Sequence, residues 1–99
     1  MPAKFLSPPM KIIFPPYVLK RMIERQISVE DVRDVLENGD VIEEYPADEP
    51  PRYLMLGWSG DRPIHVVGED DPLADETTAV TVYEPDAKLW KAGFRERKR

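Results

Sequence analysis

The single histidine of this chain, His65, is the foremost candidate for acid–base chemistry. Imidazole is the side chain whose ordinary pKa lies closest to neutrality, so it can take up and release a proton under physiological conditions. His65 lies in the apolar run Pro63–Val67, which predicts a strand. A histidine that only forms hydrogen bonds within a sheet is the structural alternative, and the sequence leaves both interpretations open.

Side-chain alternation along a second predicted strand brings hydroxyl groups towards His65. In residues 78–83, one face is expected to carry Thr78, Val80 and Val82, and the other Ala79, Thr81 and Tyr83. Because the more apolar sets should pack on helices, we expect His65, Thr81 and Tyr83 to project together from the open face. The Tyr83 hydroxyl could then act as an acid beside the imidazole. A shift of one residue in register would break this cluster.

Basic residues gather at both ends of an acidic chain, whose net charge is −5. Residues 1–26 hold five bases against one acid, residues 27–87 hold three bases against 17 acids, and residues 88–99 hold six bases against one acid. If the fold brings the two ends together, they form a cationic patch. Arg21 and Arg25 lie four residues apart on one helix face, where they could hold a phosphate together. A solvated helix face and a solubilising tail are the alternative.

Composition argues against several other kinds of site. The chain has no cysteine, so it has no disulfide, no thiolate metal site and no cysteine nucleophile. The acidic residues Asp70, Asp71, Asp75 and Glu76 lack the glycine and the spacing of a calcium loop, and a single histidine argues against zinc. No phosphate-binding loop or dinucleotide fingerprint occurs. We therefore expect no metal and no cofactor, and, without a signal peptide or an apolar membrane span, a cytoplasmic protein.

The elements that must position these residues follow from periodicity. Residues 1–9 indicate an extended lead-in, residues 11–14 could form a short edge strand, and Pro15-Pro16 starts a helix that runs to Gln26. Ser28 predicts the cap of a second helix, with Asp31 completing a capping box and Asn38-Gly39 closing the helix in a left-handed conformation. Residues 41–45, 52–58, 63–67 and 77–83 predict four strands. A short amphipathic helix with Leu89 and Trp90 then precedes the basic tail 95–99.

Together these elements predict a single α+β domain over residues 1–99. The short connections between the strands favour a four-stranded antiparallel meander, with the two N-terminal helices packed on one face and a short C-terminal helix after the last strand. The other face of the sheet is then partly open. A functional site is expected on that open face.

Motifs distributed along the chain resemble a known family. In order they are Arg21-Met22, the Ile27-Ser28 junction, Leu36-Glu-Asn-Gly39, Leu56-Gly-Trp58, Arg62-Pro-Ile-His-Val66 and Thr81-Val-Tyr-Glu-Pro85 with Trp90. Over roughly residues 10 to 97 they resemble the bacterial domain-of-unknown-function family 4258, which is itself similar to the toxins of toxin–antitoxin pairs with the RelE/ParE-like fold. One position departs from the family, which usually has a histidine where this chain has Tyr17.

The resemblance implies a toxin-like, metal-independent endoribonuclease that acts on single-stranded mRNA and is paired with a small antitoxin protein. Such an enzyme uses the 2′-hydroxyl of the RNA as nucleophile, and it needs a base, an acid and cations around the phosphate. The residues then expected to be catalytic are His65, Tyr83 and Arg21, and those expected to bind substrate are Tyr17, Arg25, Thr81, Arg95 and Arg97. The alternative is a non-catalytic protein-binding module of the same fold with a degenerate site, which Tyr17 favours. A homodimer is compatible with both.

Overall fold

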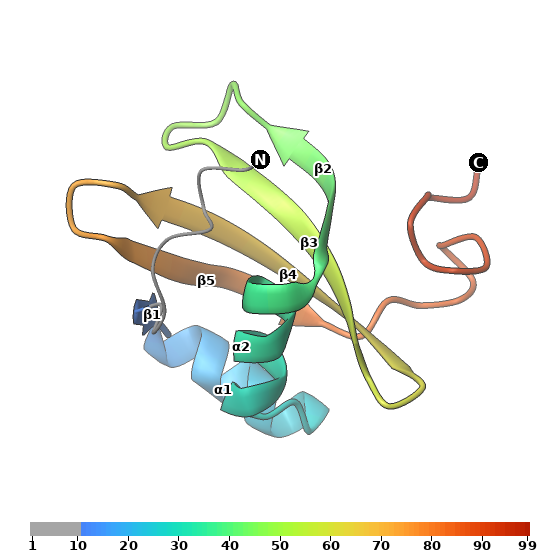
Figure 1. The fold of residues 1–99 in the computed structure, drawn as a ribbon. Coiled ribbons are helices and arrows are strands. Elements are labelled where there is room, and N and C mark those ends of the chain that lie inside the picture. The colour runs from blue at the N-terminus through green and yellow to red at the C-terminus, as the bar shows by residue number, and fades with distance from the viewer. Residues whose placement is uncertain (1–10) are drawn as a thin grey trace.

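The computed structural model describes residues 11–99, so the expected lead-in of residues 1–9 lies outside the described residues. The elements follow in the order β1 (Lys11–Ile13), α1 (Pro16–Arg25), α2 (Val29–Asn38), β2 (Asp40–Tyr45), β3 (Arg52–Ser59), β4 (Arg62–Asp71) and β5 (Glu76–Tyr83) (Figure 1). The strands form one sheet in the order β1-β5-β4-β3-β2. Strand β1 is parallel to β5, and the other neighbours are antiparallel. The architecture is therefore α+β with a mixed sheet.

The expected four-stranded antiparallel sheet is wrong, because β1 adds a fifth strand. Lys11 to Ile13 pair in parallel with Glu76 to Thr78 at the start of β5. Parallel neighbours need a long crossover, which here consists of both helices and strands β2 to β4. The sequence marks residues 11–14 as a short strand, but nothing local to them indicates a partner at the other end of the chain.

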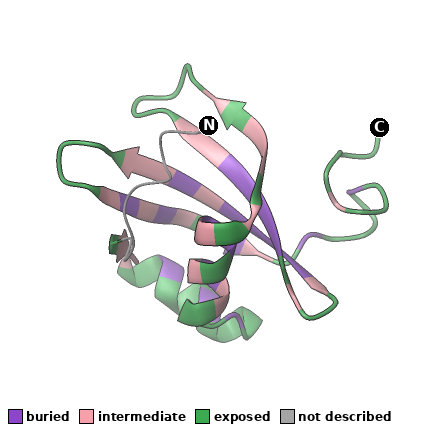
Figure 2. Ribbon diagram, viewed as in Figure 1, coloured by how far each residue is buried: buried purple, intermediate pink, exposed green. Residues whose placement is uncertain are grey.

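Both helices pack on the same face of the sheet and bury its main core. Figure 2 shows buried positions along the central strands, while the outer surfaces of the helices are exposed. The fully buried cluster consists of Val18, Met22, Ile27, Val32, Val35, Leu36, Met55, Ile64, Val66, Ala79 and Val82. Gly57 of β3 allows α2 to approach closely, since a Cβ atom there would lie 2.6 Å from Cγ2 of Val35. None of the helices in residues 11–99 is long and apolar enough to cross a membrane.

The predicted capping box at the start of α2 is confirmed. The Ser28 hydroxyl accepts a hydrogen bond from the Asp31 amide at 3.0 Å, and the Asp31 carboxylate accepts one from the Ser28 amide at 3.2 Å. The predicted left-handed closure at Gly39 is wrong, since Gly39 has an ordinary φ of −78°. The left-handed residue instead ends α1, at Gln26 with φ 58°. Gln26 therefore makes the tight turn that sets the two helices against the sheet.

A bulge in β5 changes which side chains face the helices. Val67 pairs with Thr81 and Gly68 pairs with Ala79, so Val80 lies in the irregularity between the two pairs. Ala79 and Val82 consequently both belong to the core, and the expected face of Thr78, Val80 and Val82 is wrong. The bulge lies before Thr81, so strict alternation still holds from Thr81 to Tyr83.

Arg62, at the start of β4, fastens the end of α1 to the sheet. Its guanidinium donates to the backbone oxygen of Gln26 at 2.6 Å and to that of Arg25 at 2.5 Å. Its third contact, at 2.8 Å, is with the carboxylate of Glu84, which follows β5. Carbonyls in the last turn of a helix lack partners within the helix, so one arginine satisfies two of them and joins three segments.

Residues 85–99, which we call the C-terminal segment, do not form the predicted helix. A single turn forms where the amides of Leu89 and Trp90 both donate to the oxygen of Asp86. Gly93 and Phe94 then take positive φ angles of 88° and 60° and reverse the chain. Trp90 and Arg97 consequently lie opposite each other as an isolated antiparallel bridge. The propensity of residues 87–91 for a helix is overridden because this reversal places Trp90 against the sheet.

Candidate functional site

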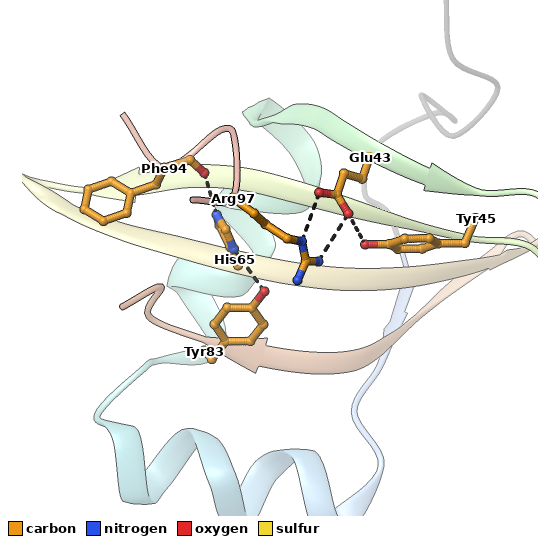
Figure 3. Close-up of polar contacts among 6 residues, drawn as sticks. All are labelled: Glu43, Tyr45, His65, Tyr83, Phe94 and Arg97. Carbon is orange, nitrogen blue, oxygen red and sulfur yellow. Dashed lines mark hydrogen bonds and ion pairs between the residues drawn. The ribbon is translucent and has the colours of Figure 1, made fainter. Parts of the chain in front are cut away.

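His65 and Tyr83 form a hydrogen-bonded pair on the sheet face opposite the helices (Figure 3). The two residues are direct partners in the β4–β5 register. Nδ1 of His65 lies 3.1 Å from the Tyr83 hydroxyl oxygen, and the two rings meet edge to face at 5.2 Å. Alternation along the strands thus brings together two of the three residues expected to be catalytic.

The ring of His65 is fully buried, and both of its nitrogens have partners. Nε2 lies 2.9 Å from the backbone oxygen of Phe94, which can only accept, so Nε2 carries the hydrogen. Nδ1 of the neutral ring then accepts the hydroxyl hydrogen of Tyr83. Trp90 covers the ring edge to face at 4.4 Å. Burial lowers the pKa of His65, and the hydrogen bond to Phe94 only partly opposes this effect. The imidazole is therefore neutral at physiological pH and shielded from solvent.

An ion pair between β2 and the C-terminal segment lies beside His65 and Tyr83. The guanidinium of Arg97 contacts the carboxylate of Glu43 at 3.3 and 3.4 Å, and it lies over the Trp90 ring at 4.8 Å from the ring centre. Tyr45 donates a hydrogen bond to the same carboxylate. Burial would raise the pKa of Glu43, but the hydrogen bonds from Tyr45 and Arg97 lower it overall. Burial and Glu43 raise the pKa of Tyr45 to about 12.

The sequence interpretation missed the partners that surround His65. Glu43 and Tyr45 alternate in an acidic strand, which is the usual pattern of a solvated face. The role of Phe94 is carried by its backbone oxygen, for which no side-chain pattern exists. Trp90 is one of the residues that carry the family resemblance. Its place among those motifs was the only sign in the sequence that it lies over the histidine.

Four of the predicted site residues line a separate groove between α1 and β5. The groove has a volume of about 280 Å³ and is lined by Tyr17, Val18, Arg21, Arg25, Val80, Thr81 and Val82. Tyr17 donates its hydroxyl to the oxygen of Val80 at 3.0 Å, and Arg25 donates to the oxygen of Val82 at 2.7 Å. The Arg21 side chain is 61% exposed, with only a 4.0 Å contact to Glu24. Two guanidinium groups thus line one side of the groove.

Among the described residues, the basic helix α1 and the basic tail do not meet. Arg95 and Arg97 pair with Asp40 and Glu43 of β2, whereas α1 packs against β5. Two strands separate β2 from β5, a distance of about 14 Å across the sheet, and the arginines lie on the face opposite the helices. Arg21 and Arg25 therefore share no phosphate site with the tail. Within residues 11–99, no cluster of three or more histidine, aspartate and glutamate side chains could hold a metal ion.

Comparison with known proteins identifies the family of the chain. The family model described as a domain of unknown function, DUF4258, matches residues 18–84, which hold nearly all of α1, all of α2 and strands β2 to β5. The match ends before the C-terminal segment. No curated protein and no solved structure matches the chain, and the resemblance to RelE/ParE-like toxins stays a prediction. Because the match extends over more than half of its residues, the chain belongs to the DUF4258 family.

Proposed function

We propose that this protein is a non-catalytic module that binds single-stranded RNA in the groove between α1 and β5. The observation that carries the proposal is the lining of that groove. On a chain of net charge −5, the described residues that line it include two arginines and two hydroxyl side chains and no carboxylate. A cationic groove on an otherwise acidic surface attracts an anionic ligand, whereas the rest of the surface repels it.

The side chains of the groove suit a nucleotide strand. Arginine forms charge-assisted hydrogen bonds with phosphate, and aromatic rings provide stacking surfaces for bases of any sequence. Tyr17 is 58% exposed, while its hydroxyl is fixed on the backbone oxygen of Val80. Arg25 is likewise fixed by its bond to Val82. Side chains that are already held in place lose less conformational entropy when a ligand binds.

The environment of His65 argues against acid–base catalysis in the conformation described. A general base must reach the 2′-hydroxyl of the RNA within hydrogen-bond distance. Here the imidazole is buried, Nε2 donates to Phe94 and Nδ1 accepts from Tyr83, so neither nitrogen is available to a substrate. A histidine with both nitrogens satisfied in this way stabilises the packing of the C-terminal segment.

A toxin-like endoribonuclease is the second candidate, favoured by the hydrogen bond between His65 and Tyr83. An imidazole and a phenol in direct contact could divide the base and acid roles of RNA cleavage. This function requires that the C-terminal segment leave the sheet, because Trp90 and Phe94 otherwise cover the pair. A small antitoxin as partner belongs to this second candidate.

The experiment measures binding and cleavage on one labelled single-stranded RNA. Two phosphate contacts give an expected slope of about −1.4 for log K against log salt, since each contributes about −0.7 on a single strand. Arg21→Ala should weaken binding about fivefold at low salt and lower the slope by about half. Lys91→Ala is the matched control, because it removes one positive charge from the C-terminal segment. Equal losses in the two variants would refute binding in the groove.

The same samples separate the two candidate functions. RNA that is bound and recovered intact supports the non-catalytic module. Cleavage by the wild-type protein that is abolished in both His65→Gln and Tyr83→Phe would refute it and support the endoribonuclease. Circular dichroism of each variant checks that the fold is retained.

A further inference from the structure

The C-terminal segment is joined to the rest of the protein through few residues. Trp90 and the backbone oxygen of Phe94 contact His65, and the Phe94 ring meets Trp58 of β3 edge to face at 6.0 Å. Arg95 and Arg97 contact strand β2. Among the described residues, its backbone-to-backbone hydrogen bonds join only residues of the segment itself, such as Lys91 to Glu96 and Lys98 to Leu89. The segment therefore has its own internal structure and lies on the sheet without joining it as a strand.

The main core is complete without the C-terminal segment. The buried cluster between the helices and the sheet contains residues from Val18 to Val82 and none from the segment. The family match also ends at residue 84, one residue before the segment begins. Both observations indicate that the segment can leave the sheet while the domain stays folded.

Two exposed ion pairs hold the segment against β2. Arg97 lies 3.3 Å from Glu43, with side chains that are 59% and 28% exposed, and Arg95 lies 2.9 Å from Asp40, with side chains that are 55% and 66% exposed. Ion pairs with this exposure are weak and are screened by salt. The Arg97 guanidinium additionally covers Trp90, so its loss weakens two contacts at once.

We propose that the C-terminal segment is a strap that detaches as a unit, that the Arg97–Glu43 and Arg95–Asp40 pairs control its detachment, and that detachment exposes His65 and Tyr83 to solvent. The inference does not depend on RNA binding, because the groove between α1 and β5 lies apart from the strap. The site of His65 is then closed in the free protein at low salt and opens as the ion pairs are screened.

The single histidine of the chain gives a direct test. Diethyl pyrocarbonate modifies exposed neutral imidazole, and the absorbance of the product reports only on His65. Wild-type protein should react slowly at low salt and faster as sodium chloride is added. Arg97→Ala should react about fivefold faster at low salt and respond less to added salt. Lys91→Ala is the matched control and should react like wild type, because Lys91 pairs with Glu96 inside the strap.

Reversing the charges of the Arg97–Glu43 pair gives a second test. Glu43→Arg combined with Arg97→Glu restores opposite charges and should return the reaction towards the wild-type rate, whereas Glu43→Arg alone should react faster. Equal reaction rates in Arg97→Ala and Lys91→Ala would overturn the proposal. So would a His65 reaction whose urea dependence equals that of global unfolding followed by circular dichroism, because exposure would then require loss of the whole fold.

Discussion

Replacing Arg62 should destabilise the protein more than replacing any other arginine on a strand. In Arg62→Ala, the last carbonyls of α1 at Arg25 and Gln26 lose their partner, and Glu84 loses its ion pair. A hydrogen bond that involves a charged group contributes roughly 1.5–3 kcal/mol. The Arg62 side chain is 29% exposed, so water replaces part of what is lost. We therefore expect a loss of about 2–3 kcal/mol, from a total of about 5–15 kcal/mol for such a domain.

The assay is urea unfolding at neutral pH, supported by thermal melting. A loss of this size should lower the melting temperature of a domain of about 100 residues by roughly 10–20 °C. Arg62→Lys should be destabilised almost as much as Arg62→Ala. An ammonium group cannot reproduce the forked guanidinium that reaches two carbonyls and a carboxylate. Arg52→Ala is the control, since Arg52 forms an ion pair of similar length, 2.7 Å to Glu69, on the strand surface and contacts no helix end.

The comparison with Arg52 decides whether the reasoning holds. Isolated ion pairs on a strand surface contribute little, so Arg52→Ala should leave the unfolding midpoint nearly unchanged. If Arg62→Ala and Arg52→Ala shift the midpoint equally, the contacts of Arg62 with the end of α1 contribute nothing measurable. The position of α1 beside β5 would then depend on the shared core and on the bonds of Tyr17 and Arg25 to β5.

Three further predictions concern the core, the buried histidine and a helix cap. Gly57→Ala should cost about 1–3 kcal/mol in urea unfolding, because the new Cβ would lie 2.6 Å from Val35; an unchanged midpoint would contradict the close packing of α2. Burial lowers the pKa of His65 from its ordinary 6.5, so the unfolded chain protonates first as pH falls below about 6.5. Stability should then decrease by up to about 1.4 kcal/mol per pH unit until the lower pKa of the folded state is reached. His65→Gln should lose this dependence in urea titrations above pH 5, and a slope that persists in the variant would assign it to another group. Ser28→Ala should cost about 1 kcal/mol by the same assay, and an unchanged midpoint would argue against the cap.

Features that depend on residues close together in the sequence were predictable. Ser28 and Asp31 are three residues apart, and their capping box needs no tertiary contact. The common face of His65 and Tyr83 followed from alternation in two strands that are joined by one hairpin. In each of these cases the geometry depends on the local backbone and on the nearest strand.

Features that depend on contacts across the chain were not predictable. The partner of β1 lies at the other end of the sequence, and three residues carry too little pattern to specify it. The bulge at Val80 moved Ala79 into the core, and the glycine beside it, Gly68, lies on the partner strand β4, so no glycine or proline of β5 itself marks it. The C-terminal segment has helical spacing around Leu89 and Trp90, but burying Trp90 over His65 and pairing Arg97 with Glu43 favour the reversed conformation. Glu43 could not be identified as a neighbour of His65 for the same reason.

The hydrogen bonds of Tyr17 and Arg25 to β5 also have a consequence for self-association. Beyond the three residues that β1 covers, β5 lies at the edge of the sheet, and its carbonyls at Val80 and Val82 could accept a strand from another molecule. The side chains of α1 occupy both acceptors and so block this growth. Removing Arg25 would free one of them and favour aggregation, which could be mistaken for a loss of ligand binding. Solubility and the proposed RNA binding in the groove would therefore depend on the same helix face, and Arg21 is the residue at which they can be separated.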